Sequence, residues 1–292
     1  AYVFPGQGTQ KVGMGYELHR SSTVARAVFD EAEKALGFSL TRLCFEGPEH
    51  ELRRTINAQP AILTVSVACL RAAAEEQRVE QHPSFVAGHS VGEYSALVAA
   101  GVLDLQDAVR LVRERGRLME EAGEKRPGTM MAIMGLDEMS VSEICQQTGA
   151  EIANVNSAQQ IVISGPRTAL ARAVDLAKAM GAKKAIPLDV SGAFHTSLME
   201  PAVEGMAKAI SGTPFSDAKV PVVVNSTALP VTTGEEIKAE LLWQLCNCVR
   251  WHESVRYMIA AGVSTFVEIG PGQVLSGLIK RIDENVATVS VS

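Results

Sequence analysis

Ser90 has the sequence surroundings of an enzyme nucleophile. It is the centre of Gly88-His89-Ser90-Val91-Gly92, a G-x-S-x-G pattern between an apolar segment and a helix-like one. Glycine two residues to either side permits a sharp strand-to-helix turn, because a side chain there would collide with the crowded backbone. The turn also places Ser90 at a helix N-terminus, where backbone N–H groups can bind a developing oxyanion. The pattern predicts nucleophilic catalysis, and the alternative is a glycine-rich turn with an incidental serine.

His195 is the histidine best placed to act as the base for Ser90. It lies in the small-residue loop Val190–Thr196 after an apolar strand, and strand ends are where α/β proteins present catalytic groups. His89 is adjacent to the serine but points in a different direction on such a turn, so we expect it to pack and brace the turn. Polar neighbours predict surface positions for His19, His50 and His82.

Arg115 lies on the apolar side of a predicted helix that Asp104 caps and that runs to about Glu121. At about 100° per residue, that side comprises Leu105, Ala108, Val109, Leu111, Val112, Gly116, Leu118 and Met119. An inward guanidinium keeps its charge, so it must find an anion or several carbonyl groups. Two hypotheses follow: an internal salt bridge, or a site for a substrate carboxylate, which the planar guanidinium suits better than lysine would.

A glycine-rich loop, Pro5-Gly6-Gln7-Gly8-Thr9-Gln10, follows the first expected strand. It does not match the dinucleotide-binding fingerprint, because Lys11 stands where the third glycine belongs, and it does not match the Walker A spacing. Its backbone N–H groups are still able to bind an oxyanion. A plain turn between a strand and a helix is the alternative.

The elements expected around these residues alternate between strands and helices, which favours an α/β fold with a largely parallel sheet. A helix over 61–74 could begin at Pro60, since proline is common in a first helical turn. Strands of this sheet are expected at Tyr2–Phe4, Ser84–Ala87, Val220–Asn225 and Thr265–Ile269.

A second unit is expected in the middle of the chain. The composition changes at Glu124–Gly128, which is a plausible hinge. Beyond it the predicted order is strand, helix, strand, strand, helix, strand, as in a ferredoxin-like domain. These elements are expected at 130–134, 139–148, 152–155, 160–164, 167–180 and 184–188. We therefore predict an α/β catalytic domain from residues 1–124 and 191–292, with a small ferredoxin-like α+β subdomain inserted at 125–190.

The composition of the chain argues against several classes of protein. Of its 292 residues, 47% are hydrophobic and 21% are charged, as in an ordinary soluble enzyme. A net charge of −6 without a basic run argues against nucleic acid as a partner. Five scattered cysteines without a C-x-x-C pair indicate neither a zinc cluster nor a disulfide framework, so no metal is expected and a reducing cytosol fits. No signal peptide opens the chain, its apolar runs are short for a bilayer, and no membrane partner is expected.

The chain resembles the malonyl-CoA:acyl carrier protein transacylase family over almost its whole length. The motifs that carry the resemblance are, in the family's order, Phe4–Gly8, Gly88–Ala96, Arg115–Met119, Gly192–His195 and Glu268–Gly272. The chain is also similar to the related acyltransferase domains of polyketide and fatty acid synthases. The resemblance implies a hydrolase-like α/β core with a parallel sheet and a ferredoxin-like insertion, in agreement with the elements predicted above.

The resemblance also implies roles for residues at matching positions. Ser90 would be the nucleophile, His195 its base, and Arg115 the residue that holds the malonyl carboxylate. The backbone N–H groups of Gln7 and Val91 would form the oxyanion hole.

Three further residues receive roles from the resemblance. A backbone carbonyl usually orients the imidazole in this family, and Gln244 is the matching position. Asn156 matches a polar residue of the same cleft. Phe194, before the histidine, is typical of members that take malonyl rather than methylmalonyl units, as is the aliphatic Val91 after the serine. Cys248 departs from the family, in which Asn-Pro-Val is common at 247–249.

The implied reaction is malonyl transfer from malonyl-CoA to the phosphopantetheine thiol of an acyl carrier protein, through a seryl ester and for fatty acid synthesis. No cofactor beyond the substrate is expected, and the expected location is the cytoplasm, or a plastid or mitochondrion in a eukaryote. One alternative is a free-standing acyltransferase of a polyketide synthase. Another is an esterase or thioesterase with Asp189 as its acid, although the inward Arg115 argues against neutral esters. Intact Ser90 and His195 disfavour a scaffold without activity.

The sequence is less specific about where the acyl carrier protein would dock. Carrier proteins are expected to be acidic, so basic surface residues are the natural candidates. Two basic pairs, Lys183–Lys184 and Lys280–Arg281, are the ones we expect to face the carrier.

Overall fold

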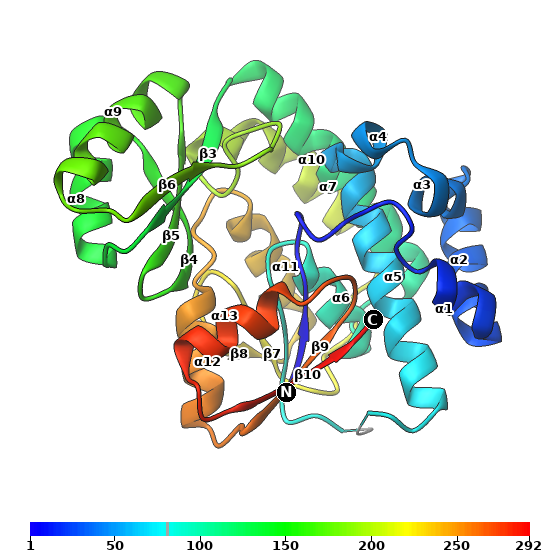
Figure 1. Ribbon diagram of the computed structural model, residues 1–292. Coiled ribbons are helices and arrows are strands. Elements are labelled where there is room, and N and C mark those ends of the chain that lie inside the picture. The colour runs from blue at the N-terminus through cyan, green and yellow to red at the C-terminus, as the bar shows by residue number, and fades with distance from the viewer. Residues whose placement is uncertain (80–81) are drawn as a thin grey trace.

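The computed structural model describes residues 1–79 and 82–292, which form two β-sheets with helices packed around them (Figure 1). The larger sheet has six strands in the spatial order β10-β9-β1-β2-β7-β8. These are β1 (Tyr2–Phe4), β2 (Val86–Gly88), β7 (Val222–Val223), β8 (Pro230–Val231), β9 (Thr265–Ile269) and β10 (Ala287–Val291). All neighbouring pairs are parallel except β7 with β8. The predicted α/β fold with a largely parallel sheet is confirmed.

Both edge strands, β8 and β10, lie outside the predicted strands. β8 is a two-residue strand that begins with Pro230, which has no N–H to donate to a neighbouring strand. β10 is half-exposed, with small and hydroxyl-bearing residues at most of its positions, and pairs only with β9. Such edge strands carry little apolar signal, because only one of their sides is packed in the core.

Helices surround the larger sheet, and the longest of them form its main hydrophobic layer. The helices outside the small subdomain are α1 (Tyr16–Ser21), α2 (Thr23–Leu36), α3 (Leu40–Glu46), α4 (Glu49–Arg53), α5 (Thr55–Glu75), α6 (Gly92–Ala99), α7 (Leu105–Lys125), the 3₁₀-helix η1 (Ser197–Ala202), α10 (Val203–Ser211), α11 (Gly234–Gln244), α12 (Trp251–Ala260) and α13 (Val274–Ile282). The predicted cap of α7 is present, because the Asp104 carboxylate accepts a hydrogen bond from Asp107 N at 2.7 Å. The helix ends at Lys125, one turn beyond the expected end.

Helix α5 begins earlier than predicted, at Thr55 rather than at Pro60, which lies inside the helix. A proline there has no N–H for the carbonyl of Ile56, four residues before it. The guanidinium of Arg113 on α7 donates to that carbonyl instead, at 3.2 Å. The helix therefore continues through Pro60 because a neighbouring helix satisfies the freed oxygen.

Among the described residues, α5 alone has the length and apolar composition of a membrane-spanning helix. In the fold it is a core helix, because 83% of its most apolar window is buried by the rest of the protein.

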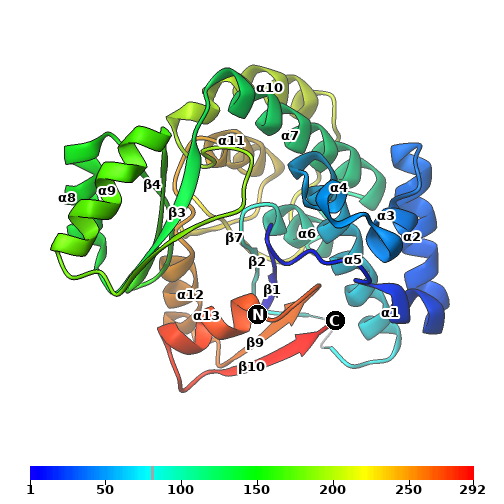
Figure 2. The same ribbon diagram turned by 45° about the horizontal axis from the view of Figure 1, so that its top comes forward.

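The small subdomain consists of β3 (Thr129–Met134), α8 (Glu138–Thr148), β4 (Glu151–Ser157), β5 (Gln160–Gly165), α9 (Arg167–Ala179) and β6 (Lys184–Pro187). Its sheet is antiparallel, in the order β4-β5-β3-β6, which is the ferredoxin-like arrangement. Figure 2 shows α8 and α9 on the face of this sheet that points away from the larger sheet. The predicted order of elements is confirmed. The exact domain boundaries at 124/125 and 190/191 stay a prediction.

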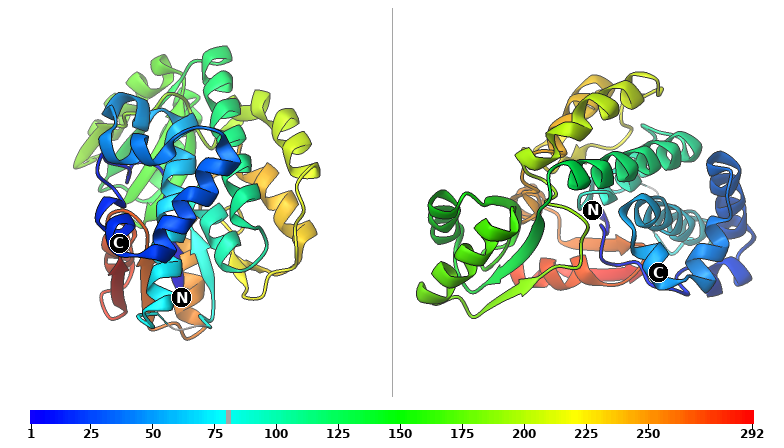
Figure 3. Two further views of the ribbon diagram at one scale, coloured as in Figure 1. Left: turned by 90° about the vertical axis from the view of Figure 1, so that its right-hand side faces the viewer. Right: turned by 90° about the horizontal axis from the view of Figure 1, so that it is seen from above.

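The two subdomains meet beside the carboxyl ends of the central strands. Viewed from above, the small subdomain and helices α1–α4 lie at opposite ends of the molecule (Figure 3). Between them lie the residues that follow β1, β2 and β7, which are neighbours in the sheet. The carboxyl edge of a parallel sheet is where α/β proteins usually build their sites.

Candidate active site

Ser90 lies on a sharp turn between β2 and α6, as the G-x-S-x-G pattern predicts. Its φ of 53° is in the left-handed region, which residues other than glycine rarely occupy. A Cβ on Gly88 would lie 2.0 Å from the backbone of Gly92, and one on Gly92 would lie 2.2 Å from Phe4 O. Only glycine therefore lets the turn close on itself and pack against the end of β1.

His195 is within hydrogen-bond reach of the serine. Its Nε2 lies 2.7 Å from Ser90 Oγ, and its Nδ1 lies 2.9 Å from the backbone oxygen of Gln244. Because a carbonyl only accepts, Nδ1 carries the proton and Nε2 is free to accept the serine proton. Burial and then the positive charge of Arg115 lower the pKa of His195 from 6.5 to about 3. The imidazole is therefore neutral, as a general base must be.

Asp189 does not complete a triad with His195. Its side chain is 85% exposed and forms an ion pair with Arg53 at 2.8 Å. The backbone carbonyl of Gln244 occupies the Nδ1 side of the imidazole instead. The hypothesis of an esterase with Asp189 as its acid is wrong in this respect.

Arg115 points into the protein and reaches the serine, as its position on the helix predicts. It is 1% exposed. Its Nη1 donates to Gln59 Oε1 at 2.9 Å, and its Nη2 donates to Gln244 Oε1 at 2.9 Å and to Ser90 Oγ at 3.3 Å. The guanidinium carbon lies 5.6 Å from the centre of the Tyr94 ring.

No described acidic side chain forms an ion pair with Arg115, and its Nε has no hydrogen-bond partner among the described residues. The hypothesis of an internal salt bridge is therefore wrong. Two neutral amides hold the guanidinium beside the serine, and no described acid forms an ion pair with it.

The backbone N–H groups of Gln7 and Val91 donate to no other group within the described part of the chain. The loop that carries Gln7 packs directly on the serine turn, since a Cβ on Gly6 would lie 2.4 Å from His89 O. The N–H of Ser90 itself is engaged, because it donates to Asn225 Oδ1 at 2.7 Å. The arrangement leaves Gln7 and Val91 as the amides able to bind an oxyanion.

His89 has the packing role that we expected for it. Its Nε2 lies 2.8 Å from Asn156 Oδ1, and its ring packs against the ring of Trp251. It is partly buried, and this burial lowers its pKa. The structure thus links Asn156 to the serine turn through His89.

A cavity of about 260 Å³ opens above Ser90. Its walls come from both subdomains and include Met119, Met130, Ala132, Asn156, Val162, Leu188, Val190, Phe194, Val274, Leu275 and Leu278. Phe194 and Asn156 therefore line the site, as expected, and most of the other wall residues are apolar. Within the described residues there is no group of three His, Cys, Asp or Glu side chains placed to hold a metal ion.

Sequence reasoning missed two buried residues that support the turn, Asn225 and Glu93. Asn225, at the end of a predicted strand, accepts from Ser90 N and donates from Nδ2 to Gly88 O at 2.6 Å. Glu93, inside the quoted serine motif, accepts from Asn225 N at 2.8 Å. Burial and then the charge of Glu240 raise the pKa of Glu93 well above its usual range. A polar side chain at a position that the pattern buries, as for Glu93 and Asn225, is the signal that could have found them.

Gln59, which holds Arg115, is another buried polar residue that sequence reasoning missed. It is fully buried on the apolar helix α5, next to Pro60. A buried amide in such a helix needs a polar partner, and here its Oε1 meets the guanidinium and its Nε2 meets Met119 Sδ at 3.3 Å.

Comparison with known proteins places this geometry in a family. The model of the acyl transferase domain family matches residues 1–291. The malonyl CoA-acyl carrier protein transacylases of Bacillus subtilis (strain 168) and Escherichia coli (strain K12) are 46% and 44% identical to the chain. Both matches cover 100% of this chain, and they cover 93% and 95% of the two relatives.

Solved structures agree with the sequence relatives. An acyl-carrier-protein S-malonyltransferase from Bartonella henselae superposes with a TM-score of 0.95 at 42% identity, over 100% of this chain and 94% of that one. A malonyl-transacylase in complex with a type II polyketide synthase acyl-carrier protein has a TM-score of 0.95 at 43% identity, over 99% and 94% of the two chains. The chain therefore belongs to the malonyl CoA-acyl carrier protein transacylases of the acyl transferase domain family.

Proposed function

We propose that the protein transfers a malonyl group from malonyl-CoA to the phosphopantetheine thiol of an acyl carrier protein. The observation that carries the proposal is the buried Arg115 guanidinium, which lies beside the Ser90–His195 pair without a carboxylate partner among the described residues. A malonyl group brings the missing carboxylate, and relatives named for malonyl transfer support the same substrate. No cofactor is required for the reaction.

The first half-reaction forms an ester on Ser90. His195 Nε2 takes the proton of Ser90 Oγ while Oγ attacks the thioester carbonyl carbon. The tetrahedral oxyanion is stabilised by the N–H groups of Gln7 and Val91. The carbon–sulfur bond then breaks, and the coenzyme A sulfur leaves with the proton from His195.

The second half-reaction reverses these steps with a different thiol. His195 takes the proton of the carrier's phosphopantetheine thiol, whose sulfur attacks the seryl ester and releases Ser90 with its proton. The backbone carbonyl of Gln244 keeps the imidazole in the productive tautomer in both halves, at 2.9 Å from Nδ1.

Two wall residues are proposed to select the substrate. Phe194 is buried directly before the base and lines the cavity, so its ring limits the space beside the malonyl methylene carbon. Asn156 also lines the cavity and is proposed to contact the substrate. Its Oδ1 lies 2.8 Å from His89 Nε2.

We propose that the acyl carrier protein docks next to the active-site cavity. Lys183 and Arg281 line one surface hollow together with Gln160, which also lines the cavity. Arg281 Nη1 donates to Gln160 Oε1 at 2.7 Å, and Lys280 Nζ donates to the backbone oxygens of Glu284 and Val286. An acidic carrier would meet the Lys183–Arg281 side of the opening.

Fatty acid synthesis in the cytoplasm is the pathway we propose. The polyketide alternative keeps one specific observation in its favour, the similar transacylase bound to a type II polyketide synthase carrier. The two differ only in the carrier that accepts malonyl, so transfer rates to one carrier of each kind would separate them.

Mixing the protein with malonyl-CoA in the absence of a carrier is expected to add the mass of one malonyl group. Peptide mapping should place that group on the segment that contains Ser90, because the ester accumulates when no thiol accepts it. Intact-mass spectrometry is the measurement, with Ser90→Ala as the control that gains no mass. A malonyl group elsewhere, or transfer to a carrier without any ester, would contradict the covalent mechanism.

The kcat/KM of acylation is expected to stay level from about pH 8 down to about pH 5. A histidine base is active when it has lost its proton, and the lowered pKa of His195, about 3, keeps it in that form throughout this range. A pH profile of the initial acylation rate tests this, with Michaelis parameters measured at each pH. A loss of rate centred near pH 6.5 would show that the base has an ordinary histidine pKa.

A further inference from the structure

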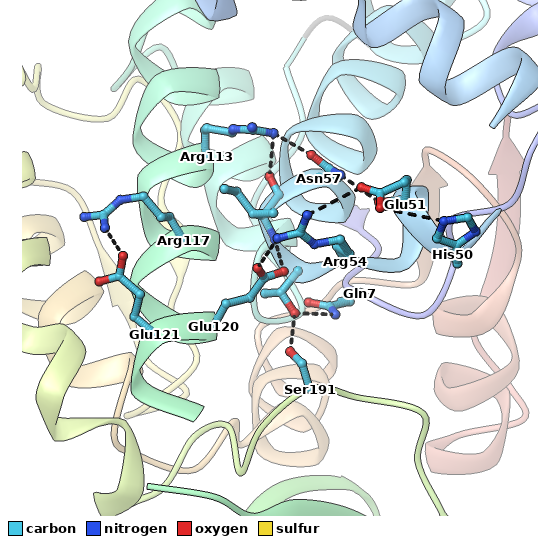
Figure 4. A network of polar contacts seen from close by, with 12 residues as sticks. Gln7, His50, Glu51, Arg54, Asn57, Arg113, Arg117, Glu120, Glu121 and Ser191 are labelled. Carbon is cyan, nitrogen blue, oxygen red and sulfur yellow. Dashed lines mark hydrogen bonds and ion pairs between the residues drawn. The ribbon is translucent and has the colours of Figure 1, made fainter. Parts of the chain in front are cut away.

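The hydroxyl of Thr55 joins two loops of the active site. Thr55 is the first residue of α5 and is 1% exposed. Its Oγ1 accepts a hydrogen bond from Gln7 Nε2 at 3.2 Å and lies 3.0 Å from Ser191 Oγ. Figure 4 shows the Gln7 and Ser191 side chains meeting at this point from different segments of the chain. A hydroxyl has one donor and two acceptor sites, so it can serve both partners at once.

The loop on one side of Thr55 carries Gln7 and is anchored at more than one point. Gln7 stands between Gly6 and Gly8, and Gly8 has a φ of 103°, which few other residues adopt. The peptide that carries the Gln7 N–H also carries Gly6 O, which accepts a hydrogen bond from Thr9 Oγ1 at 2.9 Å. The side chain of Gln7 gives this peptide its second anchor. The hydrogen bond to Thr55 is the one hydrogen bond that the Gln7 side chain makes within the described residues.

The loop on the other side carries the base. Ser191 precedes His195 by four residues, and the loop passes so close to α7 that a Cβ on Gly123 would lie 2.9 Å from Ser191 O. The Gln244 carbonyl holds the imidazole end of this loop, and Thr55 contacts its beginning.

Thr55 itself is held by a rigid pair of helices. The Glu120 carboxylate on α7 accepts from Ile56 N at 3.0 Å and from Arg54 Nη2 at 3.1 Å, which satisfies the start of α5 (Figure 4). A Cβ on Gly116 would lie 2.7 Å from Thr55 O, so the two helices touch through their backbones. Gly116 follows Arg115 directly, and the Thr55 hydroxyl is therefore fixed relative to Arg115, which is proposed to bind the malonyl carboxylate.

We propose that Thr55 is a positioning residue for acyl transfer. Its hydroxyl holds the Gln7 side chain and, together with the Thr9 hydroxyl on Gly6 O, sets the direction of the Gln7 N–H. It also links this oxyanion donor to the loop that carries His195. The inference rests on the proposed function, since it concerns the oxyanion of that reaction. It adds a second role for the α5 N-terminus, which already holds Arg115 through Gln59 one turn later.

Thr55→Val against Thr55→Ser is the matched test. Valine keeps the shape and removes the hydroxyl, whereas serine keeps the hydroxyl. We expect Thr55→Val to lower the kcat of Ser90 acylation about 10-fold, less than the 10²- to 10³-fold for loss of an oxyanion donor, because Val91 still donates. The KM for malonyl-CoA should change less than about twofold, because Arg115 is untouched, and Thr55→Ser should keep most of the wild-type rate.

Gln7→Met is a second variant that tests the same hydrogen bond without a change inside α5. It removes Nε2, keeps the backbone N–H, and should reproduce the loss of kcat. The double variant should lose no more than either single variant, because both remove the same hydrogen bond. Additive losses, or an equal loss in Thr55→Ser and Thr55→Val, would show a general packing effect and overturn the proposal.

The outcomes also separate this inference from the proposed function. If the wild-type protein forms no malonyl ester on Ser90, the proposed function fails and this inference fails with it. If the wild type forms the ester and a folded Thr55→Val variant forms it at the same rate, only the role of Thr55 is wrong. Melting temperatures identify the folded variants.

Discussion

Replacing His195 with alanine is expected to slow the acylation of Ser90 by malonyl-CoA by about 10²- to 10⁴-fold, the usual contribution of a positioned general base. The reason is geometric, since Nε2 lies 2.7 Å from Ser90 Oγ and Nδ1 is held by the Gln244 carbonyl. Without the imidazole, the serine proton has to leave to water. Rapid-quench acylation followed by intact-mass spectrometry measures the rate.

Two histidine variants serve as comparisons. His50→Ala removes an exposed histidine and should acylate at the wild-type rate. His89→Ala removes a partly buried ring whose Nε2 faces Asn156 rather than the serine, so any loss there should come with a lower melting temperature. Wild-type acylation in a folded His195→Ala variant would mean that another group, His89 first, is the base.

Replacing Arg115 with alanine is expected to change which acyl group the enzyme accepts. A charge-assisted contact to a carboxylate contributes about 1.5–3 kcal/mol, so malonyl transfer should fall by roughly 10- to 150-fold. Acetyl-CoA has no carboxylate to lose, so its transfer should not share this penalty. The preference for malonyl over acetyl should therefore drop, as measured by kcat/KM for the two thioesters.

The same variant has a structural cost that must be kept apart from selectivity. Gln59 Oε1 and Gln244 Oε1 both lose their donor, and a buried acceptor without a partner costs about 1–3 kcal/mol. Arg117→Ala is the matched control, because Arg117 lies on the same helix and pairs with Glu114 and Glu121 at the surface. A lower melting temperature with an unchanged malonyl-to-acetyl ratio would show that Arg115 only supports the fold.

Local pattern alone was sufficient for several features of the site. The sharp turn at Ser90 was predictable because the glycines that such a turn requires lie within five residues of sequence. The distances at Gly88 and Gly92 confirm that a side chain would not fit at either position. The inward direction of Arg115 was predictable because helical periodicity assigns each residue to a side. The order of elements in the small subdomain was predictable because apolar residues repeat with different periods in strands and in helices.

Helix and strand ends were less predictable, because tertiary partners can override local preferences. Pro60 predicts a helix start, yet α5 runs through it because Arg113 satisfies the freed Ile56 carbonyl. That partner is distant in the sequence and belongs to another helix. The edge strand β10 was missed because pairing with β9, rather than an apolar pattern of its own, makes it a strand.

The sequence by itself thus determined the chemical groups of this protein: a serine on a tight turn, a histidine after a strand, and a cation on an apolar helix face. Only the tertiary structure decided how they are connected. It assigned the imidazole Nδ1 to the Gln244 carbonyl rather than to Asp189, and it joined Gln7 to Thr55. The physical reason is that every residue has a backbone carbonyl and every residue except proline has an N–H, so sequence does not mark which of them is used. Packing of distant segments makes that choice.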